Sequence, residues 1–267
     1  MLIDKKLYHQ YFEKDKKSNY VNLDLGIFTH FKFMVDTGLI KQNSHRTFAF
    51  AYNWLVSYLW KYSKYTNQEI NTQDIKTILG VSPQEKRVNY LIKKDGVLDK
   101  VGYTETTRDF PISTDLTGDD GIKITQLSDI DKMLAETYLK KYNSRYTCNK
   151  PLLQYHREGK EGLMFSKDDT IPIYVFEFTR CVLCSEIGVD GFMIYCYMKY
   201  RSKMLGYVPV TIFNNEIVDA VGFKERKFRV LIQNLEQVGL IEIDRKVSKT
   251  DGTFAKSNTY KIIHKGS

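Results

Sequence analysis

Two segments of the chain place Lys and Arg among the polar positions of a predicted helix, and each segment follows a glycine that can end the preceding helix. The polar residues of the first segment are Ser82, Gln84, Lys86, Arg87 and Asn89. Those of the second are Lys224, Arg226, Lys227, Arg229 and Gln233. Arg can bond bidentately to guanine, and Gln or Asn to adenine, with about 1 to 3 kcal/mol of discrimination for each pair. We therefore expect both segments to contact double-stranded DNA, with Arg87, Arg226 and Arg229 as the main candidates for base contacts.

Two further stretches have the composition of hairpin tips that contact DNA phosphates. The first runs from Thr104 to Asp109 and offers Thr106 and Arg108. The second surrounds the turn dipeptide Asp251-Gly252 and is more basic. It offers Arg245, Lys246, Lys249 and Lys256. Contacts to phosphates fix the position of a protein on the duplex without reading sequence, and they make the affinity fall steeply with salt.

Residues with other chemistry give weaker patterns. Cys181-x-x-Cys184 has the spacing of half a zinc site, which Cys148 and His156 would have to complete. Because that pair lies in an apolar run, buried thiols are the favoured interpretation. The five histidines are scattered, and the chain lacks the phosphate-binding pattern GxxxxGKS or GxxxxGKT. We expect no catalytic site, no bound metal and no cofactor.

The elements that would position the first set of basic residues follow one another closely. A long amphipathic helix is predicted from the periodicity of Phe48, Tyr52, Leu55 and Leu59, and a short helix from Thr72 to Gly80. A third helix is predicted over 81–96, with Ser82 as N-cap. Two strands over 97–112 would then form a hairpin. Helix, helix, helix and hairpin is the order of a winged helix-turn-helix.

A second set repeats this order in the last third of the chain. The pattern predicts a helix over 191–204, a short strand over 208–213, helices over 214–222 and 224–239, and a hairpin over 241–263. When the two sets are aligned, Gly80 pairs with Gly222 and Gly96 with Gly239, at separations of 142 and 143 residues. An internal repeat of this kind predicts two copies of one structural unit.

The domain organisation follows from these two sets. We predict a mainly helical α+β protein: an N-terminal segment (1–43) that packs on the first unit, winged-helix domain 1 (44–113), a connector with one helix capped by Ser128 (114–170) and winged-helix domain 2 (171–267). A chain of 267 residues is long enough for two compact domains. The role of the connector is left open between a packed helix, a dimerisation arm and a linker.

Composition supports a globular protein with an anionic partner. Forty Lys and Arg face thirty-two Asp and Glu, a net charge of +8, and the pI is near 9.0. The N-terminus lacks the apolar run of a secretory signal, and every apolar stretch is too short or too charged to span a membrane. We therefore expect a bacterial cytoplasmic protein with reduced cysteines and no membrane contact.

The paired segments ILGVSPQEKRVNYLIKKDGVL and AVGFKERKFRVLIQNLEQVGLI give the chain a layout that resembles the tandem winged-helix replication initiators of bacterial plasmids and phages. The resemblance covers about two thirds of the chain, and the long connector departs from the family pattern. It implies binding to repeated origin sites, recruitment of host replication proteins, and repression of the protein's own gene as a homodimer. The alternatives are a transcriptional regulator that binds a palindromic operator as a dimer, and a DNA-segregation or structural adaptor.

Overall fold

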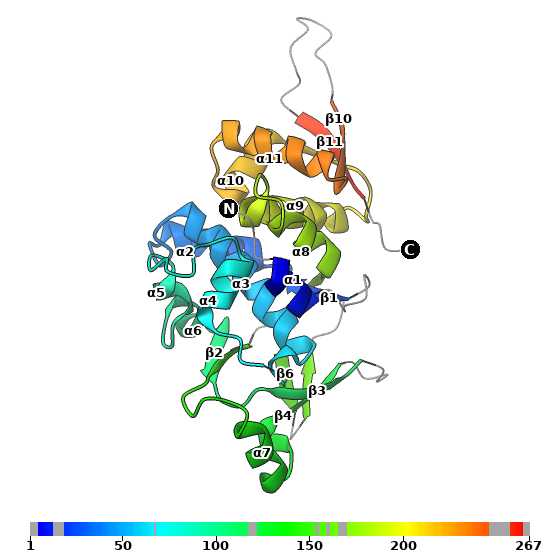
Figure 1. The fold of residues 1–267 in the computed structure, drawn as a ribbon. Coiled ribbons are helices and arrows are strands. Elements are labelled where there is room, and N and C mark those ends of the chain that lie inside the picture. The colour runs from blue at the N-terminus through cyan, green and yellow to red at the C-terminus, as the bar shows by residue number, and fades with distance from the viewer. Residues whose placement is uncertain are drawn as a thin grey trace, which may run out of the picture.

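The computed structural model describes residues 5–12, 19–66, 68–116, 122–152, 155–158, 161–164, 170–245 and 257–263. It shows a mainly helical α+β protein with small sheets, as the sequence predicts (Figure 1). The α-helices are α1 (Lys5–Phe12), α2 (Ile27–Asp36), α3 (Asn43–Lys61), α4 (Thr72–Ile78), α5 (Asn89–Ile92), α6 (Val97–Lys100), α7 (Lys132–Leu139), α8 (Val175–Val182), α9 (Gly188–Met204), α10 (Asn214–Val221) and α11 (Glu225–Gln237). The strands are β1 (Tyr20–Asp24), β2 (Thr104–Thr107), β3 (Pro111–Asp115), β4 (Lys123–Gln126), β5 (Cys148–Pro151), β6 (Tyr155–Glu158), β7 (Glu161–Met164), β8 (Thr170–Tyr174), β9 (Val210–Phe213), β10 (Ile241–Asp244) and β11 (Ser257–Ile262), with 3-10 turns at Lys64–Thr66 and Leu127–Asp129.

Helix α3 runs through the interior of the molecule. All residues from His45 to Lys61 are buried, which is the environment expected for a helix with large apolar side chains on every face. Trp54 stacks on Phe178 of α8 with ring centroids 4.1 Å apart, and its indole N–H donates to the carbonyl of Ile173 in β8 at 3.3 Å. The buried apolar side chains of the described ranges form one cluster, which extends from α1 to β11.

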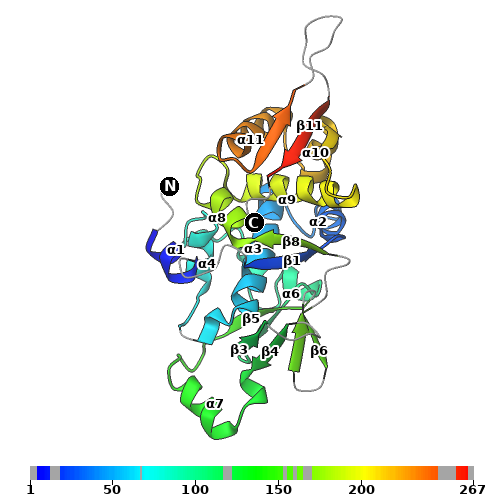
Figure 2. The ribbon, with the colours of Figure 1, turned by 90° about the vertical axis from the view of Figure 1, so that its right-hand side faces the viewer.

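Strands β1 and β8 form an antiparallel pair beside α3 (Figure 2). Tyr20 lies opposite Tyr174, and Asp24 opposite Thr170. The side chains of β1 alternate between partly buried and buried, because successive residues of a strand point to opposite faces. Backbone pairing therefore joins the predicted N-terminal segment to the first residues of the predicted second domain.

The element order predicted for the last third of the chain is confirmed. Helix α9 is followed by β9, α10, α11 and the antiparallel pair β10–β11, and the three strands form a sheet in the order β10-β11-β9. Ile241 pairs with Ile262 at the base of the hairpin. These elements lie together at one end of the molecule, the upper end in Figure 1. The predicted tip around Asp251-Gly252 lies outside the described residues.

The helix predicted over 81–96 is wrong, although α4 before it begins at Thr72 as predicted. Residues 81–88 form turns, and only the short helices α5 and α6 follow. The carbonyl of Glu85 accepts a hydrogen bond from Lys76 Nζ at 2.7 Å, while the N–H of Asn89 turns to the carbonyl of Lys86 at 3.1 Å. The hydrogen bond between residues 85 and 89 that would continue a helix is thus replaced by a contact with α4.

The first predicted hairpin is also wrong. Strand β2 pairs with β5, and β3 pairs with β4, so that β2 and β3 belong to different sheets. The chain turns away between them, where the carbonyl of the buried Phe110 accepts from the N–H of Leu127 at 3.0 Å. The ring of Phe110 packs on Tyr142, at 4.9 Å between centroids. The aromatic side chains of the connector therefore draw this segment into another sheet.

The connector contains the predicted helix, α7, but Asp131 and not Ser128 caps it, through a hydrogen bond to the N–H of Met133 at 2.9 Å. The connector also supplies most of a four-stranded sheet in the order β3-β4-β7-β6, which the sequence analysis missed. This sheet and α7 lie at the opposite end of the molecule from α11 (Figures 1 and 2). The connector is therefore packed structure over its described residues.

Candidate nucleic-acid interface

Helix α11 has the two faces that the sequence predicts. Its buried side chains are Phe228, Leu231, Ile232 and Leu235, a spacing of three, four and seven residues that aligns them along one side. The predicted DNA-contacting residues all lie exposed on or just before this helix: Lys224, Arg226, Lys227, Arg229 and Gln233. The structure therefore brings these five side chains together on one helix.

The turn that starts α11 is fixed to the N-terminal part of α3. Gly222 ends α10 with φ +75°, a left-handed conformation that glycine adopts without steric cost. Its carbonyl accepts a hydrogen bond from Asn43 Nδ2 at 2.6 Å, and the carbonyl of Ala220 accepts one from Arg46. These contacts between distant parts of the chain hold the beginning of α11 against α3.

The cations of α11 differ in how firmly they are held. Lys227 pairs with Asp190 of α9 and lies 4.6 Å from the centroid of the Phe223 ring. Arg229 pairs with Glu225, one turn earlier on the same helix, at 2.7 Å. By contrast, the side chains of Lys224, Arg226 and Gln233 make no hydrogen bond or ion pair with any residue that the structure describes. These three side chains can reorient towards a ligand without breaking such a contact.

The hairpin contributes one described candidate. Arg245 follows β10 and bonds with both carboxylate oxygens of Glu236, at 3.1 Å for the longer contact. This hydrogen bond raises the pKa of Arg245, so its positive charge is retained. The other three hairpin candidates, Lys246, Lys249 and Lys256, lie outside the described residues.

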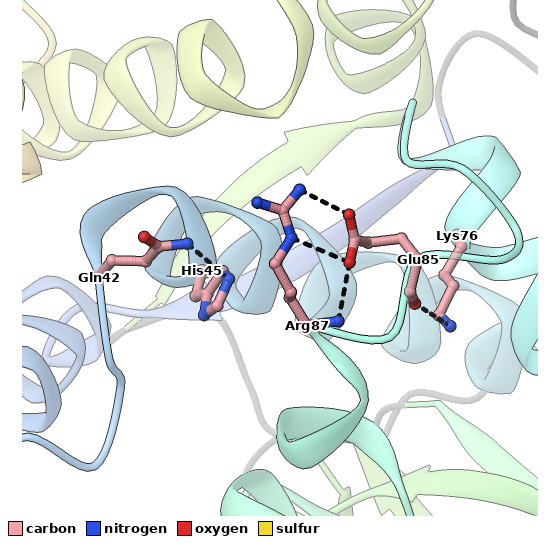
Figure 3. A network of polar contacts seen from close by, with 5 residues as sticks. All are labelled: Gln42, His45, Lys76, Glu85 and Arg87. Atoms are coloured by element: carbon pink, nitrogen blue, oxygen red, sulfur yellow. Dashed lines mark hydrogen bonds and ion pairs between the residues drawn. The ribbon is translucent and has the colours of Figure 1, made fainter.

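The first predicted set is exposed but does not form a recognition helix. Ser82, Gln84, Lys86 and Arg87 lie in turns, and Asn89 is the half-buried first residue of α5. Arg87 holds the Glu85 carboxylate through Nε at 3.0 Å and a second guanidinium nitrogen at 2.6 Å (Figure 3). This bidentate hydrogen bond lowers the pKa of Glu85 to about 2 and raises the pKa of Arg87.

Thr106 and Arg108 do not form a hairpin tip. The hydroxyls of Thr104 and Thr106 both donate to the carboxylate of Asp99, at 2.6 and 2.9 Å, and so attach β2 to the end of α6. Arg108 is exposed in the bend that follows β2. The hydroxyl of Thr106 therefore already has a hydrogen-bond partner within the protein, the carboxylate of Asp99.

Sequence reasoning missed a cluster at the beginning of α3, beside Arg87. The hydroxyl of Tyr90 accepts from the backbone N–H of Lys41 at 3.0 Å and lies 3.1 Å from His45 Nδ1, while Lys41 Nζ lies 4.9 Å above the Tyr90 ring. Burial lowers the pKa of His45, and the positive charges of Arg87 and Lys41 lower it further against the opposing effect of Glu85. No local periodicity could reveal contacts between residues 45 positions apart.

The structure gives no support to a zinc site in the ranges that it describes. Cys181 is buried in α8, where burial raises the pKa of its thiol, and Cys184 is partly exposed in the turn that follows. No three His, Cys, Asp or Glu side chains gather as a metal site within the described ranges. The side chain of His156 lies outside them.

No helix in the described ranges combines the length and apolar character needed to cross a membrane.

Comparisons of this chain with protein-family models, with curated proteins and with solved structures found no match. Its function therefore has to be inferred from its own residues.

Proposed function

We propose that this protein binds double-stranded DNA through α11, as the recognition helix of a winged helix-turn-helix to which residues 188–245 and 257–263 contribute. The observation that carries the proposal is the exposed face of α11, on which Arg226 lies among three other cations and Gln233 and makes no ion pair with any described residue. A recognition helix enters the major groove with its N-terminal residues against base edges. Helix α10 and strand β10 both pack against α11, which supports this role.

The contacts of each side chain suggest its role. Arg226 and Gln233 carry the groups that pair with guanine and adenine and are free of ion pairs among the described residues. Lys227, Arg229 and Arg245 are held by Asp190, Glu225 and Glu236. Their natural partners on DNA are phosphates, which would compete with these carboxylates for the cations.

The more specific hypothesis is a replication initiator that binds repeated origin sites. It rests on the pairing of the two sequence segments, and both paired turns keep a glycine in the left-handed conformation, at Gly80 with φ +71° and Gly222 with φ +75°. The pairing ends after this turn, because residues 81–88 lack the helix that α11 provides. A transcriptional regulator with a palindromic operator and a DNA adaptor are the competing hypotheses.

The test is a footprint of the purified protein on the DNA that flanks its own gene, at low and at physiological salt. Protection of a defined site that weakens with salt supports DNA binding. Several direct repeats beside an A+T-rich tract favour the initiator, a single palindrome favours the regulator, and uniform protection favours the adaptor. Absence of protection at low salt would overturn DNA binding itself.

A further inference from the structure

A second group of cations lies beside the beginning of α3. We call this group the α3 corner and define it by the cations Lys41, Lys86 and Arg87, together with the histidine His45 beneath them. Lys41, Lys86 and Arg87 are exposed, while His45 is buried beneath them. Tyr90 holds Lys41 through its hydroxyl and its ring, and Glu85 holds Arg87 (Figure 3).

The corner is positive despite the presence of Glu85. The corner contains three exposed cations beside this one carboxylate, and the carboxylate already forms an ion pair with Arg87. Lys76 adds a fourth cation that bonds only to the backbone carbonyl of Glu85, at 2.7 Å. Burial is the main reason why the pKa of His45 is lowered, and the positive charges of Arg87 and Lys41 lower this pKa further, against the opposing effect of Glu85.

The corner adjoins the beginning of α11. Two residues before His45, Asn43 bonds to the carbonyl of Gly222, which is two residues before Lys224. A second link runs from Thr47 of α3 to Asp190, the same carboxylate that holds Lys227 of α11. The first turns of α3 thus connect the corner to the beginning of α11.

We propose that the α3 corner binds the phosphate backbone of the same duplex that α11 reads, so that Lys41, Lys86 and Arg87 form a sequence-independent clamp beside the recognition helix. This inference rests on the proposed function. The corner lacks a helix that could enter a groove, and its arginine is already fixed in a bidentate hydrogen bond, so a role in reading bases does not suit it. Exposed cations on a turn suit phosphates.

The experiment compares the full-length double variant Lys41→Gln and Lys86→Gln with the wild type. Binding is measured over a range of salt concentrations on two duplexes of roughly three helical turns, one from the footprinted site and one of scrambled sequence. The matched control is Lys132→Gln with Lys140→Gln, which removes two exposed charges from α7 at the other end of the molecule. Circular dichroism and thermal unfolding check that the variants fold. If the double variant Lys41→Gln and Lys86→Gln does not fold, the single variant Lys86→Gln replaces it.

The clamp predicts that the corner variant binds both duplexes at least about tenfold more weakly, and that the salt slope falls by about 1.8, because each phosphate contact contributes about 0.9. The α7 control keeps the affinity and slope of the wild type. An unchanged slope in the corner variant, with binding that still depends on Arg226, would overturn the clamp and leave the proposed function intact. A wild-type protein that binds neither duplex would overturn both.

Discussion

The region from α4 to β2 and the region from α10 to β11 have similar sequence patterns and different structures. In both, a short helix ends at a left-handed glycine, Gly80 or Gly222. After Gly222 the chain forms the thirteen-residue helix α11 and a hairpin. After Gly80 it forms turns and two helices of four residues each, and its strands pair elsewhere.

The difference lies in what the backbone meets in the folded protein. Helix α11 lacks Gly and Pro, and its four buried side chains follow a helical spacing through its whole length. The segment after Gly80 contains Pro83, and the carbonyl of its Glu85 accepts a hydrogen bond from Lys76. A shared glycine turn therefore does not guarantee a shared unit, and only the C-terminal region carries a helix suited to a DNA groove.

The largest expected effect concerns two buried lysines, Lys76 in the first region and Lys199 of α9, the helix that packs against α11. Lys199 of α9 lies 2.7 and 2.8 Å from the carboxylate oxygens of Glu177, whereas Lys76 of α4 bonds to a backbone carbonyl. Lys199→Met leaves a buried charge unpaired and should cost about 3 to 5 kcal/mol. Lys76→Met leaves one carbonyl unsatisfied and should cost about 1 to 3 kcal/mol. Urea unfolding measures the loss of unfolding free energy in each variant. Equal losses would contradict the conclusion that Lys199 neutralises a buried carboxylate whereas Lys76 satisfies a carbonyl.

The paired glycines allow a closer comparison. Alanine at either position has to adopt a left-handed backbone, which costs about 1 kcal/mol. An added Cβ meets no atom within 4 Å at Gly80 but overlaps the amide of Asn43 at Gly222. Gly222→Ala should also disturb the Asn43 hydrogen bond, for a total loss of about 2 kcal/mol against about 1 for Gly80→Ala. Thermal unfolding measures the stability of the two variants. If Gly80→Ala is as unstable as Gly222→Ala, the result argues against the tight contact between Asn43 of α3 and Gly222 at the end of α10.

A smaller effect is expected from the carboxylate that holds Arg229. Glu225→Gln removes a negative charge from the exposed face of α11 and releases a cation, so DNA affinity should rise about threefold at physiological salt. Glu105→Gln on β2 is the matched control, because it makes the same charge change at an exposed position in the other region. A rise in affinity that is the same for both variants would show that net charge, and not the α11 face, determines binding.

The smallest effect is a dependence of stability on pH through His45. Its pKa is lowered in the folded protein, first by burial and then by Arg87 and Lys41. The unfolded chain, with a histidine pKa of about 6.5, therefore binds this proton more readily, and stability falls as the pH is lowered through and below that value. The substitution His45→Gln removes the part of this loss of stability that is due to protonation of His45. Unfolding midpoints at about pH 5 and pH 8 should differ less in the variant than in the wild type, and equal differences would exclude His45 as a contributor.

Local sequence pattern was enough to predict the positions of five helices. Helices α3, α4, α9, α10 and α11 all lie where the sequence places them. The failed hairpin depends on contacts between residues distant in sequence. Strand β2 finds its partner in β5 beyond the connector's helix, and Phe110 packs on Tyr142.

The same holds for the candidate site. The exposure of Arg226 and Arg229 followed from the apolar spacing of α11. The pairing of Lys227 with Asp190 did not, because it requires α9 to lie against α11. The contact of Lys41 with Tyr90 was hidden for the same reason, since the two residues are 49 positions apart.

The central claim is that α11 reads the DNA sequence, and the most direct test is the ratio of affinities for the footprinted site and a scrambled duplex. For Arg226→Ala with Gln233→Ala, we predict that binding to the site weakens about a hundredfold, with about 1 to 3 kcal/mol lost at each base contact, so that the ratio approaches one. Gln237→Ala, exposed in the last turn of α11, should keep the wild-type ratio. A double variant that folds and keeps that ratio would contradict the assignment of α11 as the recognition helix.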